Sequence, residues 1–134
     1  MKIRAGFGVA ALCVAGVAFP IWAHHSHGQY EDTFMDIEGV VKEVHLVVPH
    51  SWIYLEVKDP KGGEPQVWAL EATGRTQLEK IGVTRDYVQP GDTVKARCHH
   101  LRDGSNGCLL GFLKAKDGTV KDWEGNGAEL PKDF

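Results

Sequence analysis

The sequence predicts an all-β domain: an OB-fold-like, five-stranded Greek-key barrel with one short helix. Two observations support this prediction. Apolar and polar residues alternate with a period of two along several segments, which is typical of half-buried strands. The predicted elements also follow the order strand, strand, strand, helix, hairpin, which is the succession of the OB-fold. A plain antiparallel sheet packed on one helix is the main alternative, and a β-sandwich would need more strands.

Three strands are predicted in the first half of the domain. The first covers residues 37–48, where the apolar residues change phase and so indicate a bulge. The second covers residues 51–57 and has the clearest alternation in the chain. Turn-forming residues at 59–63 separate it from a third strand over residues 66–72.

A short helix and a hairpin are predicted in the second half. Thr73 is placed to cap the helix, and Gly82 is placed to end it. The hairpin strands are expected around residues 94–98 and 108–112, with the Asp-Gly turn between them. Residues 119–123 can add a short edge strand.

The first 23 residues are predicted to be a secretory signal peptide. A basic start is followed by an uncharged apolar run over residues 5–19 and by a break that ends in Ala23. The run is too short for an uncleaved membrane anchor, because about 20 apolar residues are needed to cross a bilayer. The mature protein is therefore expected in the periplasm or outside the cell, without stable membrane insertion. The predicted division of the chain is a signal peptide (1–23), an extended arm (24–36), the barrel (37–123) and a flexible C-terminal tail (124–134).

The charge of the chain bears on its partners. Signal removal takes away Lys2 and Arg4 and so shifts the formal net charge from −3 to −5. A mildly acidic exported domain is a poor candidate for binding polyanions. Nucleic acid is therefore not expected as a partner. All seven histidines lie after residue 23, in the predicted mature protein.

The two cysteines of the mature part are predicted to form a disulfide bond. Cys98 and Cys108 are an even count in an exported chain, where disulfides persist. A three-residue hairpin loop with Gly104 in the left-handed conformation places the two cysteines opposite each other. The alternative is a Cys/His metal site that uses the adjacent His99 and His100.

A set of short motifs extends over residues 23–113. They are Ala-His-His-Ser at 23–26, Gly-Val-Val at 39–41, Pro-His at 49–50, Trp-Ala-Leu-Glu at 68–71, Thr-Arg-Asp at 84–86, Pro-Gly-Asp at 90–92 and Asp-Gly-Ser at 103–105. With these motifs the chain resembles an uncharacterised family of small exported bacterial proteins. Members of that family have a mature His-His-Ser start and an OB-fold-like domain. The resemblance implies a fold and a compartment, but no activity.

The histidines at the expected cleavage site indicate a metal site. Cleavage after Ala23 makes His24 the first residue, and its α-amino group and imidazole together can chelate a metal ion. Copper is the expected metal, because nitrogen ligands suit it and affinities of divalent ions peak at Cu(II). His50 is expected to complete a tetragonal site. Cleavage one residue later would instead let His25, Ser26 and His27 wrap Cu(II) as an X-X-His terminus.

Further residues are expected to support this site. The arm from His24 to Asp36 extends at most about 43 Å at about 3.3 Å per residue, which is enough to reach the loop of His50. OB-folds bind ligands on their second and third strands, between two loops that would here contain His50 and the Asp-Gly turn. Glu71 ends the third strand there, as a candidate oxygen ligand or as a partner of a ligand. The alternative is that Glu71 only stabilises the helix dipole, and that the terminal histidines are solvated and bind metal weakly.

The predicted function is a small periplasmic protein that binds or handles copper through its mature N-terminal histidine. The alternative is a metal-free OB-fold module that binds a small ligand or serves an exported protein, for example a redox protein. That module would use a face of the second strand formed by Trp52 and Tyr54, since aromatic stripes on OB-folds stack against ligands. No enzyme activity is expected: the sequence specifies no substrate for a copper-dependent oxidase and contains no evident nucleophile with a base.

Overall fold

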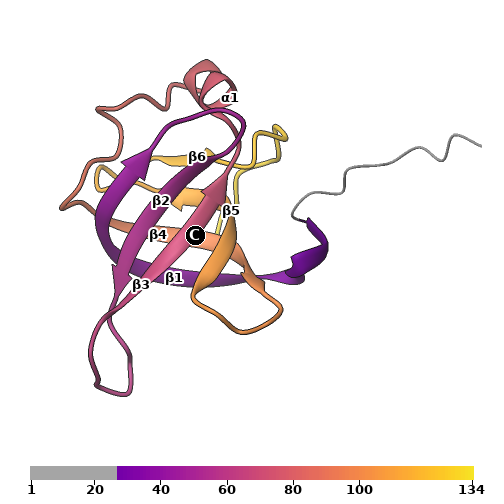
Figure 1. Cartoon of the computed structure of the whole chain (residues 1–134). Helices are drawn as coiled ribbons and strands as arrows, with labels where there is room; N and C mark the ends of the chain where they lie inside the picture. Colours follow the sequence, from indigo (N-terminus) through magenta and orange to yellow (C-terminus); the bar gives the residue numbers. More distant parts are fainter. Residues whose placement is uncertain (1–26) are drawn as a thin grey trace, which may run out of the picture.

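Six β-strands and one short α-helix form the fold of residues 27–134, the part of the chain that the computed structural model describes (Figure 1). In chain order the elements are η1 (His27–Gln29), β1 (Tyr30–His45), β2 (Ser51–Val57), β3 (Gln66–Ala72), α1 (Arg75–Lys80), β4 (Thr93–Leu101), β5 (Gly107–Lys114) and β6 (Val120–Asp122). The predicted signal peptide and the expected ligands His24 and His25 lie outside the described residues. No helix within residues 27–134 is long and apolar enough to cross a membrane.

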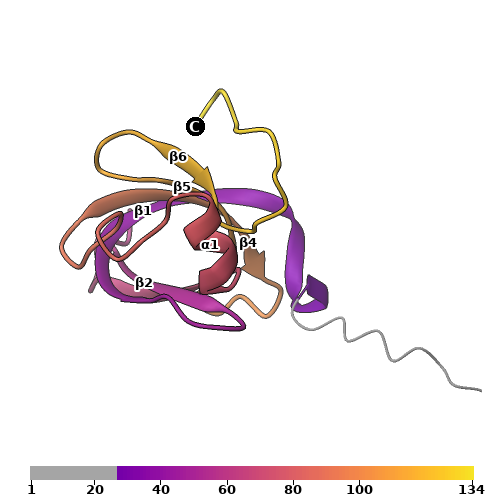
Figure 2. The same ribbon diagram turned by 90° about the horizontal axis from the view of Figure 1, so that it is seen from above.

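The strands close into a barrel. They form one sheet in the order β3-β2-β1-β4-β5-β6, and a parallel pairing of β3 with β5 joins its two sides. The long β1 pairs with β4 along its first part and with β2 along its last part, so it bends around the barrel (Figures 1 and 2). This connectivity is that of the OB-fold. The predicted all-β, OB-fold-like barrel is therefore confirmed. The alternative, a plain antiparallel sheet packed on one helix, is wrong.

Strand β1 differs from its prediction in length. It begins at Tyr30, so the second half of the expected arm belongs to the strand. The sequence does not reveal this part of the strand because residues 30–36 are largely polar, and most of them are not buried. One cross-strand pair with β4 is Asp36 opposite Arg97, joined by hydrogen bonds of 2.8 and 2.9 Å. The expected bulge is present, as a register shift between Val41 and Glu43.

The core follows the period-two pattern. Apolar side chains from alternate strand positions fill the barrel, among them Ile53, Leu55, Leu70, Val94, Ala96, Leu110, Leu113 and Trp123. Helix α1 lies over one end of the barrel, and its Leu78 is fully buried (Figure 2). Gly74, not Thr73, occupies the N-cap position. A Cβ at Gly74 would lie 2.7 Å from the carbonyl oxygen of Pro49, so a glycine lets α1 approach the β1–β2 loop closely.

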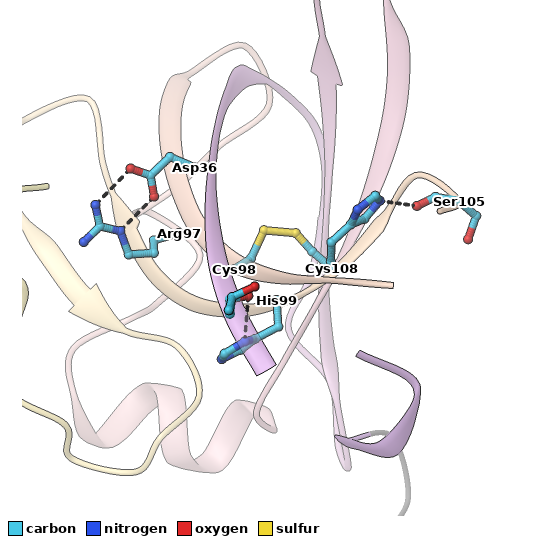
Figure 3. The surroundings of a disulfide bond; sticks show 8 residues. Asp36, Arg97, Cys98, His99, Ser105 and Cys108 are labelled. Carbon is cyan, nitrogen blue, oxygen red and sulfur yellow. Dashed lines mark hydrogen bonds and ion pairs between the residues drawn. A yellow bond between two sulfur atoms is a disulfide. The ribbon is translucent and has the colours of Figure 1, made fainter. Parts of the chain in front are cut away.

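The predicted disulfide between Cys98 and Cys108 is confirmed (Figure 3). The expected register is wrong, however, because Cys108 lies opposite His100 rather than opposite Cys98. The loop is longer than expected and covers residues 102–106, and within it the Asp103 carboxylate accepts the backbone N–H of Ser105 at 2.9 Å. The cysteines therefore bond diagonally across the hairpin, with Cα atoms 5.6 Å apart. Bonded sulfurs are not thiolates, so a Cys/His metal site with His99 and His100 is excluded.

Candidate functional site

A pocket of about 480 Å³ lies on the outer face of β2 and β3, where β1 begins and the β4–β5 loop closes over the sheet. Its lining residues are Gln29, Tyr30, His50, Trp52, Ala69, Glu71, Leu101, Asn106 and Gly107. The location matches the ligand-binding face of OB-folds, between the loop that follows the first strand and the loop that joins the last two. The pocket therefore brings together two of the predicted ligands, His50 and Glu71.

Glu71 is the centre of this pocket. It pairs with Trp52 across the β2–β3 ladder, so its side chain lies on the outer face, whereas Leu70 faces the core. Neighbouring side chains nevertheless cover Glu71 and leave only 7% of its side chain exposed. One carboxylate oxygen lies 2.5 Å from Nδ1 of His50, and the other accepts the hydroxyl of Tyr30 at 2.6 Å. The buried carboxylate thus accepts a hydrogen bond on one oxygen and has a histidine nitrogen at ion-pair distance from the other, which offsets the cost of burying its charge.

Tyr30 is the residue of this site that the sequence analysis missed. It is the first residue of β1 and is only 4% exposed. Burial raises the pKa of Tyr30 above its usual value, and the hydrogen bond and negative charge of Glu71 raise it further. No signal in the sequence identified it, because it stands within a polar segment and 41 residues away from its partner.

His50 is held by the contact between its loop and the start of α1. The backbone N–H of Arg75 donates to the carbonyl of Val47 at 2.9 Å, and the N–H of Ser51 donates to the carbonyl of Thr73. Within this fixed loop the imidazole is 41% exposed and turns its Nδ1 toward Glu71. With Nδ1 beside the carboxylate, Nε2 is the ring nitrogen left to bind a metal ion.

The N-terminal segment enters the structure beside this pocket. Helix η1 begins at His27, and Gln29 lines the pocket while its carbonyl accepts the backbone N–H of Arg102 at 2.9 Å. His24 precedes Gln29 by five residues and so lies at most about 18 Å from it. This maximum is shorter than the length of about 43 Å that was expected for an arm from His24 to Asp36. Within residues 27–134 no three His, Cys, Asp or Glu side chains form a metal-binding group.

The remaining predicted residues lie at different distances from the pocket. Trp52 lines it, and Tyr54 follows on the same outer face of β2, edge-to-face with His45 at 5.7 Å. His99 and His100 do not line it. His99 packs on Phe34, whereas His100 stacks on Trp68 and contacts the carbonyl of Ser105 at 2.9 Å.

Substitution of Tyr30 by phenylalanine is expected to reduce the loss of stability at alkaline pH. The pKa of Tyr30 is higher in the folded protein than the value of about 10 in an unfolded chain. Its contribution is therefore fully present below about pH 10 and is lost as the pH rises further, because the unfolded chain then releases the proton more readily. Urea unfolding between pH 8 and 11 measures this slope, to which one group adds up to about 1.4 kcal/mol per pH unit.

Tyr54→Phe is the matched control for this substitution, because it removes a phenol from the outer face of β2. It should leave the alkaline slope of the wild-type protein in place. An equally steep alkaline loss in Tyr30→Phe would show that the phenol of Tyr30 does not govern this transition.

A family comparison covers the site. The family of unknown function DUF6152 matches residues 10–110. This chain belongs to that family. The match spans most of the chain and includes Tyr30, His50 and Glu71. The predicted resemblance is confirmed in that the chain belongs to a family of unknown function. Export and the mature His-His-Ser start remain predictions. Comparison with curated proteins gives no match.

The chain is also similar to solved structures. Two crystal structures of the mitochondrial single-stranded DNA binding protein Rim1 from S. cerevisiae (Form2) each cover 62% of this chain and 92% of their own chain. The first is 12% identical with a TM-score of 0.48, and the selenomethionine-labelled form is 11% identical with a TM-score of 0.46. The exclusion of nucleic acid as a partner is corrected by this finding, because a net charge does not decide what one face of a barrel binds. The likeness itself assigns no ligand to this chain.

Proposed function

We propose that this DUF6152 protein is a small exported protein that binds copper with its mature N-terminal His24 and with His50. The observation that carries the proposal is the buried Glu71 carboxylate, 2.5 Å from Nδ1 of a half-exposed histidine in a pocket that Gln29, near the N-terminal end of the described residues, helps to line. A histidine that binds a metal through one ring nitrogen usually donates the other N–H to a carboxylate. The His50–Glu71 pair likewise has a carboxylate beside one ring nitrogen.

The ligand set suits Cu(II). The amine and the imidazole of His24 supply two nitrogens, and Nε2 of His50 supplies a third, in the tetragonal geometry that nitrogen ligands give to this ion. In this proposal Glu71 acts through His50, whose Nδ1 lies 2.5 Å from one carboxylate oxygen, while the other oxygen accepts the hydroxyl of Tyr30. If cleavage falls after His24, His25 becomes the terminal residue and His27 provides the nearby ring.

The proposal includes a compartment and partners but no reaction. According to this proposal, residues 1–23 are a signal peptide. Its cleavage after Ala23 in the periplasm produces the α-amino group of His24 that binds the metal. The partner is the metal ion; an exported redox protein is the partner in the metal-free alternative. The protein is a binding or handling protein in this scheme, and no catalytic step is assigned to it.

A Cu(II) titration followed by EPR tests the proposal directly. The protein is produced by natural export, its mass is recorded to fix the terminus, and a second version carries one extra Met before His24. The processed protein is expected to bind one copper ion with submicromolar affinity. The extended version should lose more than the roughly 10–100-fold that follows the removal of a residue supporting a ligand, because it loses the chelating amine itself.

Weak or equal binding by both versions would overturn the copper proposal. The alternative would then be a metal-free binding module that uses Trp52 and Tyr54 on the outer face of β2, where Trp52 lines the pocket. In that case Trp52→Ala should abolish capture of the ligand or partner, and added metal should make no difference.

A further inference from the structure

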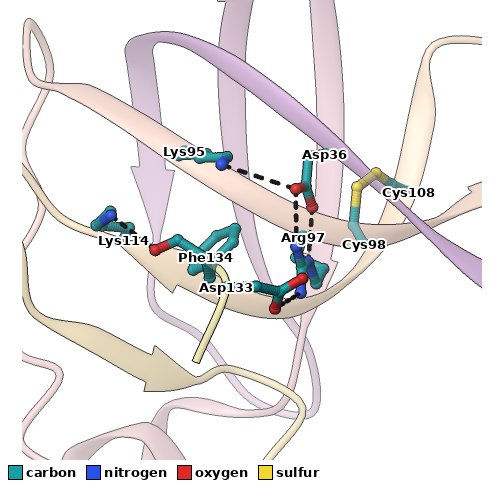
Figure 4. A network of polar contacts seen from close by, with 8 residues as sticks. All are labelled: Asp36, Lys95, Arg97, Cys98, Cys108, Lys114, Asp133 and Phe134. Atoms are coloured by element: carbon teal, nitrogen blue, oxygen red, sulfur yellow. Dashed lines mark hydrogen bonds and ion pairs between the residues drawn. A yellow bond between two sulfur atoms is a disulfide. The ribbon is translucent and has the colours of Figure 1, made fainter. Parts of the chain in front are cut away.

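A cluster of three cations lies on the outer face of β4 and β5, on strands that do not hold His50 or Glu71. Lys95, Arg97 and Lys114 surround the ring of Phe134, and their charged groups lie 5.1, 5.0 and 6.0 Å from its centroid (Figure 4). Cations over an aromatic ring are attracted by its negative face. The three cations form a local positive site, although the net charge of the whole chain is −3. The ring of Phe134 occupies this site.

A carboxylate enters the same cluster beside the ring. Oδ1 of Asp133 accepts a hydrogen bond from a terminal nitrogen of Arg97 at 2.9 Å. The opposite side of the guanidinium is fixed by Asp36 across the β1–β4 ladder, with two hydrogen bonds of 2.8 and 2.9 Å. Arg97 is thus oriented by the barrel and needs no adjustment to bind a second carboxylate, which favours recognition of an acidic group.

The segment that carries Asp133 and Phe134 is attached lightly. It turns at Asp122, whose carboxylate accepts the backbone N–H groups of Glu124, Gly125 and Ala128. Residues 125–130 are exposed, and Asp133 has 79% of its side chain exposed. Exposed ion pairs and exposed cation–π contacts are each weak. The ammonium of Lys114 also donates a part-buried hydrogen bond to the carbonyl oxygen of Phe134 at 2.8 Å. A partner segment with the same groups can make each of these contacts in place of the tail.

We propose that Lys95, Arg97 and Lys114 form a binding site for a protein segment in which an acidic residue stands next to an aromatic one. Asp133 and Phe134 occupy this site within the chain, and an acidic-aromatic segment of a partner displaces them. The carboxylate binds Arg97, and the ring stacks beneath the three cations. The site is independent of the proposed copper site, since it uses other strands and other residues.

A labelled peptide with the sequence of residues 128–134, Ala-Glu-Leu-Pro-Lys-Asp-Phe, tests the site in trans by fluorescence anisotropy. The full chain with Asp133→Ala and Phe134→Ala has an open site and should bind the peptide at least about tenfold more tightly than the wild-type chain, where the tail competes. This factor corresponds to about 1.4 kcal/mol. Arg97→Gln or Lys114→Ala in the open variant should abolish binding.

Two controls make the outcome decisive. Lys116→Ala removes one exposed cation that pairs with Asp92 outside the cluster, so the open variant with this change should bind as before. A peptide with Ala in place of Phe should lose binding, and circular dichroism checks that each variant is folded. The proposal is overturned if the peptide binds neither chain, if Lys114→Ala and Lys116→Ala act alike, or if the peptide without Phe binds equally well.

Discussion

Replacement of Glu71 by alanine is expected to weaken copper binding by about 10–100-fold, the usual effect of losing a carboxylate that orients a histidine ligand. In the proposed site the carboxylate lies 2.5 Å from Nδ1 of His50 and holds the ring so that Nε2 is the nitrogen left for the metal. Without it the ring can rotate and exchange tautomers, so fewer molecules present the lone pair that binds the metal. Isothermal titration with Cu(II), on protein with the natural terminus, measures this loss.

The same substitution is expected to lower the free energy of unfolding by about 1–3 kcal/mol, because it leaves a buried hydroxyl without its acceptor. Tyr30 is only 4% exposed, so water does not readily replace the carboxylate. Adding Tyr30→Phe to the alanine variant should restore part of the stability but none of the copper affinity. Chemical denaturation without metal separates the two effects.

Glu56→Ala is the matched control for Glu71→Ala. It removes the same charge from the outer face of β2, where Glu56 pairs with Lys42 at 3.5 Å near the surface. The control should change neither copper affinity nor stability by more than a small amount, since exposed ion pairs contribute little. Equal copper affinity in both variants and in the wild type would contradict an orienting role for Glu71.

The strands were predictable where one face is buried, because apolar and polar residues then alternate along the sequence with a period of two. Strand β2 runs from Ser51 to Val57 as predicted, because Ile53 and Leu55 face the core while Trp52 and Tyr54 face outward. The first residues of β1 do not show this alternation. They are ordered by backbone pairing with β4 and by ion pairs whose partners lie about sixty residues away in the chain, and a local pattern does not contain this information.

The candidate site was predictable only through the fold. Knowledge of where OB-folds bind their ligands placed His50 and Glu71 near one another, and the structure joins them. Tyr30 was not predictable, because its contact with Glu71 depends on where the long β1 begins. The contacts of the tail at Arg97 were likewise missed, since residues 124–134 have the polar, glycine-rich composition of a free terminus.

Removal of the disulfide, by Cys98→Ala with Cys108→Ala, is expected to lower the free energy of unfolding by about 3 kcal/mol. The bond closes a loop with a sequence separation of 10 residues, and a crosslink of this length removes that amount of entropy from the unfolded chain in the loop-closure description. Urea unfolding of both proteins, with and without a reductant, measures the difference. The reductant should destabilise the wild type and leave the variant unchanged, and a variant as stable as the oxidised wild type would contradict the prediction.

The loss of stability should be largest at the parallel pairing of β3 with β5, the seam that closes the barrel. Cys108 lies opposite Leu70 in the parallel β3–β5 pairing, and Leu109 lies opposite Glu71, so the disulfide ties the closing strand to β4 directly beside the site. This seam has only three residue pairs, whereas β2 and β3 share seven. Amide exchange in the variant should therefore accelerate first at Leu70 and Glu71, ahead of Ile53 in β2. Uniform acceleration in all strands would instead mean that the bond stabilises the barrel only as a whole.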